Sequence, residues 1–456
     1  MTGMSICCLL AAFFAEGDGI TAAEVSEYRA GAIAMAHRKS AELGCSPPGA
    51  RMKVGPRIAT GGGFDGHFLW DVAFSVFWAV RVPEEKFPVE SSLDNLYRFA
   101  EPDGYIGRQF FADGTPVWSP SHPISFNPPM LAWAELELAS SALAESNRLE
   151  RVYPLLLRHH QSCERKFRRP DGLYFGSGLG CGMDDCPRWP HGCTLEQRAA
   201  GGIPLVATSI NAPARDRWES WVRGTVATNN SWNCQAGWID MSAAMALDAR
   251  SLAKMARLVG KEDDARKLDG EYAALKEAIN RLCWSEDLGF YCDVTKDGII
   301  RRRHLGALWV LVSGVATPER AKRMVRTLFD PDVFYRPVPL ASLEKGDPDY
   351  RPNDTYFRGP AWPNLNYLAI RGLLDYGYRS EAKRLARRWY VCCLGLYRRT
   401  GGIYENLSSE CPDRPKETLS APDYAGHGCL TPIAVPALFE NEDLRMHWFP
   451  WGSHRN

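Results

Sequence analysis

Successive amphipathic segments of helical period constrain the fold of this chain most strongly. Residues 240–259 read DMSAAMALDARSLAKMARLV, and their apolar side chains recur on one helical face. A second such segment, residues 261–284, follows directly after Gly260, with Leu268 and Leu275 among its apolar positions. Clear alternating segments of the kind that form strands are few. The sequence therefore predicts an all-α fold built from paired helices.

Helix start and stop signals elsewhere in the chain fit the same plan. Residues 317–319 read TPE, which places a cap residue, a first-turn proline and an acid in the order that opens a helix. A further helix is expected to open at Ser380, to run to about Tyr397 and to stop at the TGG of residues 400–402.

The chain is expected to form one large domain, because no linker rich in Pro, Gly or Ser divides its 456 residues. About six helix pairs over this length would leave roughly 76 residues for each pair, which is more than two helices of average length need. Inner and outer rings of helices would then form a toroid with long loops. We assign this domain to residues 31–456.

Residues 1–30 are assigned to a separate N-terminal segment, which is a candidate signal peptide. The apolar run 6–14 has the length of a signal-peptide core, but no Lys or Arg precedes it. The alternative is a first helix that packs into the fold, so a cytoplasmic and an exported location both stay open. No run reaches the roughly 18 to 20 apolar residues that span a bilayer.

The charge balance bears on the class of partner. Lys and Arg number 54 and Asp and Glu number 54, which gives a formal net charge of +0. Such a chain has no long-range attraction for phosphate backbones or anionic membranes, so we do not expect a nucleic acid partner. The sequence also has no cysteine pairs at metal-ligand spacing and no glycine loop for a nucleotide, so neither a metal nor a cofactor is expected.

Five loop motifs combine carboxylates, arginines, indoles and an imidazole. They are GHFLWDVAFSVF (66–77), DGYIGRQFF (103–111), SGLGCGMDDCPRW (177–189), YFRGPAWPNLNYLAI (356–370), and GGIYENLSSE (401–410) with YAGHGCLTP (424–432). Each motif alone has an ordinary structural explanation, such as a helix cap or a solvated loop carboxylate. Because loop–helix junctions of a toroid converge at one end of its cavity, the set together indicates a sugar site. Two separated carboxyl groups there suggest glycoside hydrolysis.

The GMDDCPR stretch resembles the GLDDYPR and GMDNSPR signatures of glycoside hydrolase family 63, which includes processing α-glucosidase I and bacterial mannosylglycerate hydrolases. The FLWD, DGYIGRQ, RGPAWPNLNYL and YEN stretches resemble further blocks of this family in the same order, over residues 63–439. The resemblance implies an (α/α)6 barrel. It also implies inverting hydrolysis of α-linked glucosides or mannosides, in a small compound or an oligosaccharide, without a cofactor.

Carried onto this sequence, the resemblance makes Asp184 the general acid and Glu405 the general base, with Asp185 as a neighbour that supports the acid. The other matched positions would line the sugar subsite: Trp70, Asp71, Arg108, Gln109, Arg188, Arg358, Trp362 and His427. Leu407 and Leu430 stand where the family carries aromatic residues, which bears on the identity of the sugar.

Two other functions stay open on the sequence alone. A sugar epimerase or isomerase on the same toroid would use histidines as acid and base, and His67, His304 and His427 are the candidates. A member of the family could also bind carbohydrate without turning it over. Inversion of the product anomer would separate hydrolysis from the first alternative, and binding without turnover would favour the second.

Overall fold

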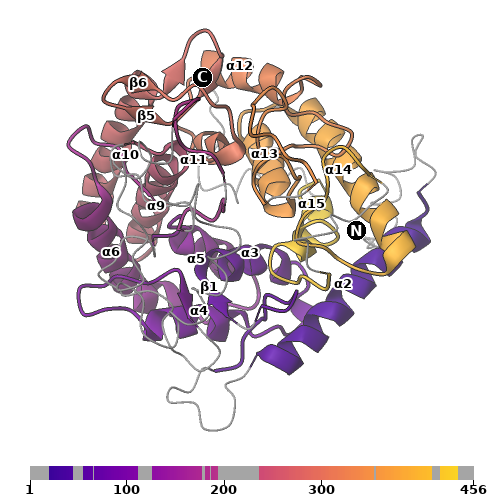
Figure 1. Ribbon diagram of the computed structural model, residues 1–456. Helices are drawn as coiled ribbons and strands as arrows, with labels where there is room; N and C mark the ends of the chain where they lie inside the picture. The colour runs from indigo at the N-terminus through magenta and orange to yellow at the C-terminus, as the bar shows by residue number, and fades with distance from the viewer. Residues whose placement is uncertain are drawn as a thin grey trace.

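The computed structural model describes residues 20–44, 55–64, 66–110, 126–176, 180–184, 186–193, 236–353, 356–412 and 422–439. Within these ranges the helices form a ring of two layers (Figure 1). The strands of the described residues form three two-stranded antiparallel ribbons: β1 (His67–Phe68) with β2 (Gln109–Phe110), β3 (Trp284–Ser285) with β4 (Phe290–Tyr291), and β5 (Val294–Thr295) with β6 (Gly298–Ile299). The predicted all-α class is confirmed.

The inner layer is a closed ring. Its members are α3 (Leu69–Ala79), α5 (Leu131–Ala139), α9 (Ile239–Leu258), α11 (Leu308–Ser313), α13 (Pro363–Asp375), and the short η5 (Gly428–Leu430) followed by α15 (Ala434–Ala437). Each member packs on the next in this order, and η5 packs back on α3. All residues of α3 are buried, as expected for a helix that is enclosed on every side and apolar all round.

The outer layer covers this ring. Its helices are α2 (Ala22–Leu43), α4 (Val89–Arg98), α6 (Arg148–Phe167), α10 (Glu262–Leu282), α12 (Pro318–Leu328) and α14 (Arg379–Thr400). Each outer helix buries one stripe and exposes the other face to solvent; in α10 the buried stripe includes Leu268, Leu275 and Ile279. The six pairs of inner and outer elements make an (α/α)6 barrel, as predicted.

The helix boundaries expected from the sequence are confirmed. Gly260 adopts a φ of 71° in the turn between α9 and α10. The Thr317 hydroxyl accepts a hydrogen bond from the Arg320 backbone N–H (3.3 Å) at the start of α12. Gly401, with a φ of 68°, ends α14 and donates its N–H to the Tyr397 carbonyl at 2.7 Å.

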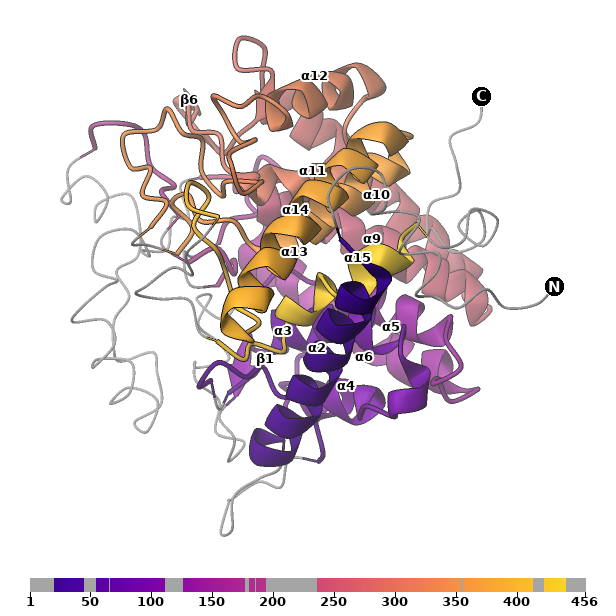
Figure 2. The ribbon, with the colours of Figure 1, turned by 90° about the vertical axis from the view of Figure 1, so that its right-hand side faces the viewer.

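The outer helix α2 brings the first described residues against the last elements of the barrel. It packs on α14 and on η5, and its buried face includes Val25, Tyr28 and Ala32 (Figure 2). The domain boundary placed at residue 30 lies inside this helix, so residues 22–30 pack as part of the barrel. Residues 1–19 lie outside the described residues. Among the helices described, none combines the length and the apolar character needed to cross a membrane.

The two ends of the barrel differ. Near the C-terminal ends of α3, α5 and α13, the carboxylate of Glu137 accepts hydrogen bonds from Arg371 (2.9 Å) and Arg81 (3.0 Å). The rings of Phe77 and Trp133 pack beside them with centroids 4.5 Å apart. These side chains fill that end, whereas described loops, including those that follow α12 and α14, gather at the other end, on the left of Figure 2.

His160 ties the outer layer to the inner one. This α6 side chain is buried, with Nδ1 2.8 Å from Oδ2 of Asp248 on α9 and Nε2 3.2 Å from Oε2 of Glu271 on α10. Burial alone would lower the pKa of His160, but the two carboxylates outweigh burial and raise the pKa to about 9. The imidazolium therefore links three helices at neutral pH.

This linkage predicts a loss of stability in alkaline solution. Because the pKa of a folded-state histidine is raised, its contribution is fully present below about pH 6.5 and is lost as pH rises through about 9. We expect His160→Gln to lower the free energy of unfolding near pH 7, and its difference from wild type to shrink by about pH 10. Urea denaturation across this range measures the effect. A difference that stays constant with pH would contradict it.

Candidate active site

Four of the predicted site residues lie at the N-terminal ends of inner elements. Trp70 and Asp71 are in the first turn of α3, Trp362 caps α13, and His427 immediately precedes η5. Gly180 of the acid loop, defined here as residues 180–188, accepts a hydrogen bond from the Asn127 side chain just before α5 (2.6 Å). Loops from distant parts of the chain thus meet at one end of the barrel, opposite the filled end.

Asp71 is a buried carboxyl group close to the predicted acid. The Tyr424 hydroxyl donates a hydrogen bond to its Oδ1 at 2.6 Å, and 7% of the residue is exposed. Burial raises the pKa of Asp71 to about 7; the charge of Asp184 adds to this effect, while Tyr424 and Arg108 oppose it. Asp184 and Arg108 are therefore both within electrostatic reach of Asp71.

Two tyrosine hydroxyls link these groups to the predicted base. Burial raises the pKa of Tyr356 well above its usual value, and the charges of Glu405, Asp184 and Asp71 add to the effect. The Tyr356 hydroxyl is hydrogen-bonded to Glu405. Burial likewise raises the pKa of Tyr424, and Asp71 and Glu405 contribute. Tyr356 is thus within electrostatic reach of Asp71, Asp184 and Glu405, the three groups called the carboxyl cluster below, and Tyr424 is within reach of Asp71 and Glu405.

The RGPAWP block holds the acid and base segments together through backbone hydrogen bonds. The Phe357 N–H donates to the carbonyl of Asp184 at 3.2 Å. Ala361 exchanges two hydrogen bonds with Leu407, of 2.8 and 2.9 Å, two residues beyond Glu405. The motif 356–370 therefore sets the spacing of the two carboxyl groups, although they lie more than two hundred residues apart in sequence.

Aromatic rings line the same region. The rings of Phe357 and Trp362 stack with centroids 3.8 Å apart and planes 9° apart. The His427 ring lies 5.8 Å from Trp362 and 4.6 Å from Tyr424. Burial lowers the pKa of His427 to about 3, so its imidazole is neutral near pH 7.

Two glycines let loops approach the start of α3. A Cβ on Gly426 would lie 2.5 Å from Oδ1 of Asp71, so the backbone at this position can come close only without a side chain. Gly182, with a φ of 79°, would place a Cβ 2.6 Å from the Trp70 ring. Substitution at either position would push a loop away from the carboxyl cluster.

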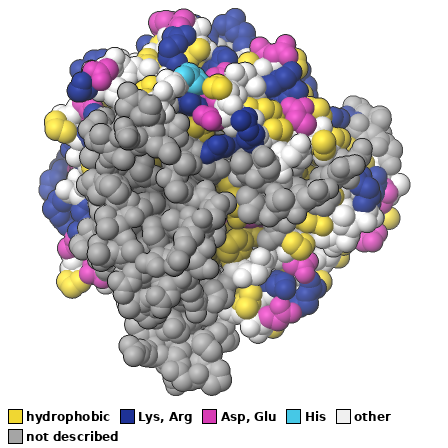
Figure 3. Space-filling view, in the orientation of Figure 1, with side chains coloured by type: hydrophobic (Ala, Val, Ile, Leu, Met, Phe, Trp, Pro, Cys, Tyr) yellow, Lys and Arg dark blue, Asp and Glu magenta, His cyan; other side chains and the backbone are white. Residues whose placement is uncertain are grey.

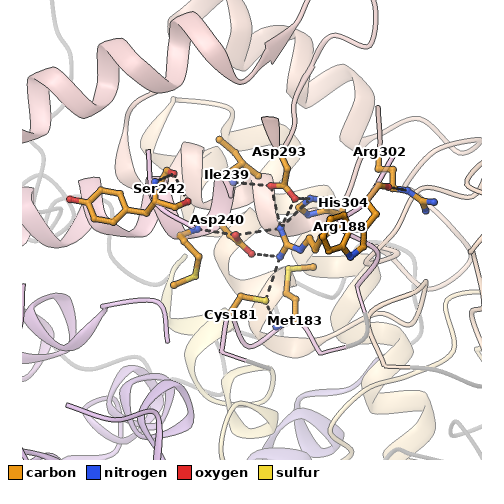
Figure 4. A network of polar contacts seen from close by, with 12 residues as sticks. Cys181, Met183, Arg188, Ile239, Asp240, Ser242, Asp293, Arg302 and His304 are labelled. Atoms are coloured by element: carbon orange, nitrogen blue, oxygen red, sulfur yellow. Dashed lines mark hydrogen bonds and ion pairs between the residues drawn. The ribbon is translucent and has the colours of Figure 1, made fainter. Parts of the chain in front are cut away.

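The structure places the remaining predicted residues in different surroundings. Gln109 pairs with Phe68 in the β1–β2 ribbon, and Arg358 is half-buried in the RGPAWP block. Arg188 is 1% exposed, and its guanidinium is bound by Asp240 and Asp293 (Figure 4). Asp185 lies outside the described residues, as do residues 194–235.

Several contributors were not singled out from the sequence. Tyr356 opens the fourth motif and Tyr424 opens the second stretch of the fifth, and those positions were the available signal for them. Asp240 and Asp293 carried no local signal, because only the fold brings them to Arg188. Leu407 and Leu430, where the resemblance led us to expect aromatic residues, are buried in the core.

Comparison with known proteins agrees with this geometry. Residues 66–410 match the model of a family described as mannosylglycerate hydrolase MGH1-like glycoside hydrolase domain. A mannosylglycerate hydrolase of Rubrobacter radiotolerans is 30% identical over 164 residues, covering 34% of this chain and 35% of that protein. The mannosyl-oligosaccharide glucosidase of Saccharomyces cerevisiae is 25% identical over 192 residues, covering 37% and 23%. The chain thus matches about a third or less of the length of these relatives.

The fold is also found among solved structures. The family 63 mannosylglycerate hydrolase of Thermus thermophilus, solved in complex with glucose, aligns with a TM-score of 0.66 at 18% identity. The alignment covers 90% of this chain and 99% of that structure, which extends the likeness over the whole barrel. Since the family model spans well over half of the chain, this protein belongs to the MGH1-like glycoside hydrolases of family 63.

Proposed function

We propose that the protein hydrolyses an α-linked glucoside or mannoside with inversion at the anomeric carbon. The observation that carries the proposal is that Phe357 donates its N–H to the Asp184 carbonyl (3.2 Å), while Ala361, four residues on, is hydrogen-bonded to Leu407, two residues beyond Glu405. Both carboxyl groups also act on the Tyr356 hydroxyl. They come from two separate loops, as an acid and a base on opposite sides of a glycosidic bond would have to do.

In the proposed reaction, Asp184 donates a proton to the glycosidic oxygen as the bond to the leaving group breaks. Glu405 removes a proton from a water that attacks the anomeric carbon from the opposite face. Tyr356 holds the Glu405 carboxylate by a hydrogen bond and so restricts its orientation toward that water. Inversion requires the two carboxyl groups to stand roughly 6.5 to 9.5 Å apart, which leaves room for the water.

Asp71 helps to explain how an acid is available near neutral pH. Asp71 and Asp184 interact electrostatically, so ionising both at once is unfavourable. The pKa of Asp71 is raised to about 7, chiefly by burial, so a carboxyl group in this region keeps its proton into the neutral range.

The proposed substrate class rests on the relatives. One is named as a mannosylglycerate hydrolase and the other as a mannosyl-oligosaccharide glucosidase, so mannosides and glucosides both belong in the first assay. The rings of Phe357 and Trp362 stack on each other and are 2% and 1% exposed, so they support the site from within the protein.

The histidine arrangement argues against an epimerase. His67 binds the Ser92 carbonyl through Nε2 at 2.8 Å, and burial lowers its pKa to about 3. His304 contacts Asp293 and Arg188, whereas His427 packs among the aromatic rings. Each of the three histidines has its own separate partners, so no two of them form an acid and base pair in the described contacts.

The first test removes each catalytic carboxyl in turn. We expect Asp184→Asn and Glu405→Gln each to lower kcat by about 10² to 10⁴-fold, because each loses one proton-transfer step. Hydrolysis of α-glucosides and α-mannosides, including glycosylglycerates, is followed by NMR so that the product anomer is seen directly.

A matched control lies in the base motif itself. Glu410 is bound by Arg336 (2.7 Å) and by the Tyr350 hydroxyl (2.8 Å), away from the carboxyl cluster. Glu410→Gln should therefore retain turnover. Full activity of Asp184→Asn, or retention of the anomeric configuration in the wild type, would overturn the assignment.

Asp71 predicts a separate pH effect on stability. An acid whose folded-state pKa is raised to about 7 holds its proton more tightly in the native state, so the free energy of unfolding falls as pH rises from about 4 to about 7. We expect Asp71→Asn to remove this part of the slope, because asparagine can still accept from Tyr424 without titrating. Urea denaturation at about pH 5 and pH 8 compares the two proteins. The solvent-exposed Asp297→Asn serves as control and should follow the wild type.

A further inference from the structure

Arg188 lies four residues after the proposed acid, yet its side chain turns into the protein. Its Nη1 donates to Oδ2 of Asp293 at 3.1 Å, and both Nη atoms donate to the carboxylate of Asp240 (Figure 4). The guanidinium also stacks on the Trp238 ring, 4.5 Å from its centroid. The polar groups that face it are thus two aspartates, His304 at 3.3 Å, and the Cys181 thiol.

The two aspartates are themselves fixed to the first turn of α9. Asp293 Oδ1 accepts from the Ile239 backbone N–H at 2.8 Å, and Asp240 Oδ1 accepts from the Met241 N–H at 2.9 Å. Burial disfavours the charged form of Asp293, but Arg188 and His304 outweigh burial and lower its pKa. Arg188 is therefore anchored to an inner helix of the barrel through charged groups that cannot shift independently.

The same side chain also joins both ends of the acid loop. Its Nη2 lies 3.5 Å from the Sγ of Cys181, three residues before Asp184, while its own backbone lies four residues after it. The turn between them is closed by the Cys186 N–H, which donates to the Met183 carbonyl at 3.2 Å. Arg188 therefore links the start of the acid loop to its end.

We propose that Arg188 is a positioning residue, which holds the acid loop on α9 and so fixes Asp184 at the glycosidic oxygen. The inference rests on the proposed function, and it replaces the expectation that Arg188 binds the sugar. Proton transfer needs the acid within hydrogen-bond reach of the leaving oxygen, and a displacement of about 1 Å costs a large part of the rate. Asp240 and Asp293 share this role, because they determine where the guanidinium lies.

Lysine cannot reproduce this arrangement. A guanidinium presents several N–H donors in one plane and can bind two carboxylates while it stacks on an indole, whereas an ammonium is a compact point charge. Arg188→Lys therefore keeps the charge balance of the buried cluster and loses its geometry. Asp293→Asn is a second, milder variant, because its amide oxygen can still accept from the Ile239 N–H.

Arg148 offers a matched control. It is also fully buried and charged, with Nε 2.7 Å from Glu135 Oε2 and Nη2 3.2 Å from Asp94 Oδ1, and it joins α4, α5 and α6. Arg148→Lys should lower thermal stability in the same manner as Arg188→Lys, but it should leave the position of the acid loop unchanged. Comparing the two variants separates positioning of the acid from general loss of stability.

The experiment compares two leaving groups in the wild type and in these variants. An α-glycosyl fluoride needs little protonation of its leaving group, whereas an alkyl α-glycoside depends on the acid. We expect Arg188→Lys and Asp293→Asn to lower kcat on the alkyl glycoside by about 10²-fold, with a much smaller loss on the fluoride. The KM and the dissociation constant of the free sugar should stay unchanged, and Arg148→Lys should lose equally little on both substrates.

The outcomes distinguish this inference from the proposed function. A wild type that turns over neither substrate defeats the proposed function itself. An active wild type with Arg188→Lys indistinguishable from Arg148→Lys overturns the positioning role alone. Weaker sugar binding in Arg188→Lys, with equal losses on both leaving groups, would make Arg188 a sugar ligand and also overturn it.

Discussion

The rest of this structure depends on closing a ring of inner helices that all begin at the same end of the barrel. A closed ring encloses its helices on most sides, so α3, α9 and α13 are buried over most of their length. The C-terminal end of the ring is filled, so its polar groups need hydrogen-bond partners within the protein. Glu137 finds such partners in Arg371 and Arg81. Only the other end is left for loops, and those loops carry the carboxyl cluster.

The closed ring also fixes the relative positions of the segments that form the site. The acid, the base and Asp71 come from three distant segments, but each segment is fixed to an inner helix or to the RGPAWP block by backbone hydrogen bonds or by Tyr424. Charged side chains of both signs are interspersed over the described surface that faces the viewer in Figure 3. The groups of closely interacting charges described above are instead buried, in the carboxyl cluster and in the Arg188 network.

Local features of the fold could be predicted because local chemistry decides them. The turn at Gly260 and the cap at Thr317 need only neighbours within a few residues, and both lie where the sequence places them. The motif residues Asp71, Asp184 and Glu405 are brought to one region, as the junctions of a toroid required. Arg188 was different, because its partners Asp240 and Asp293 are 52 and 105 residues further along the chain. No period or spacing in the sequence reports a pairing at that separation.

The packing of α2 against η5 and α14 has a consequence for folding during synthesis. The helix at residues 22–43 is synthesised before the inner ring, but the surface it covers includes residues 428–430, which are synthesised after α3, α5, α9, α11 and α13. Until residues 428–430 are added, the ring stays open and the apolar face of α2 lacks part of its packing surface. His427 and Tyr424 arrive with the same late segment, so a nascent chain acquires its carboxyl cluster only when the barrel shuts. A chain that ends before this segment would leave the apolar face of α2 exposed. Such an intermediate is prone to aggregation and is a target for chaperones and proteases.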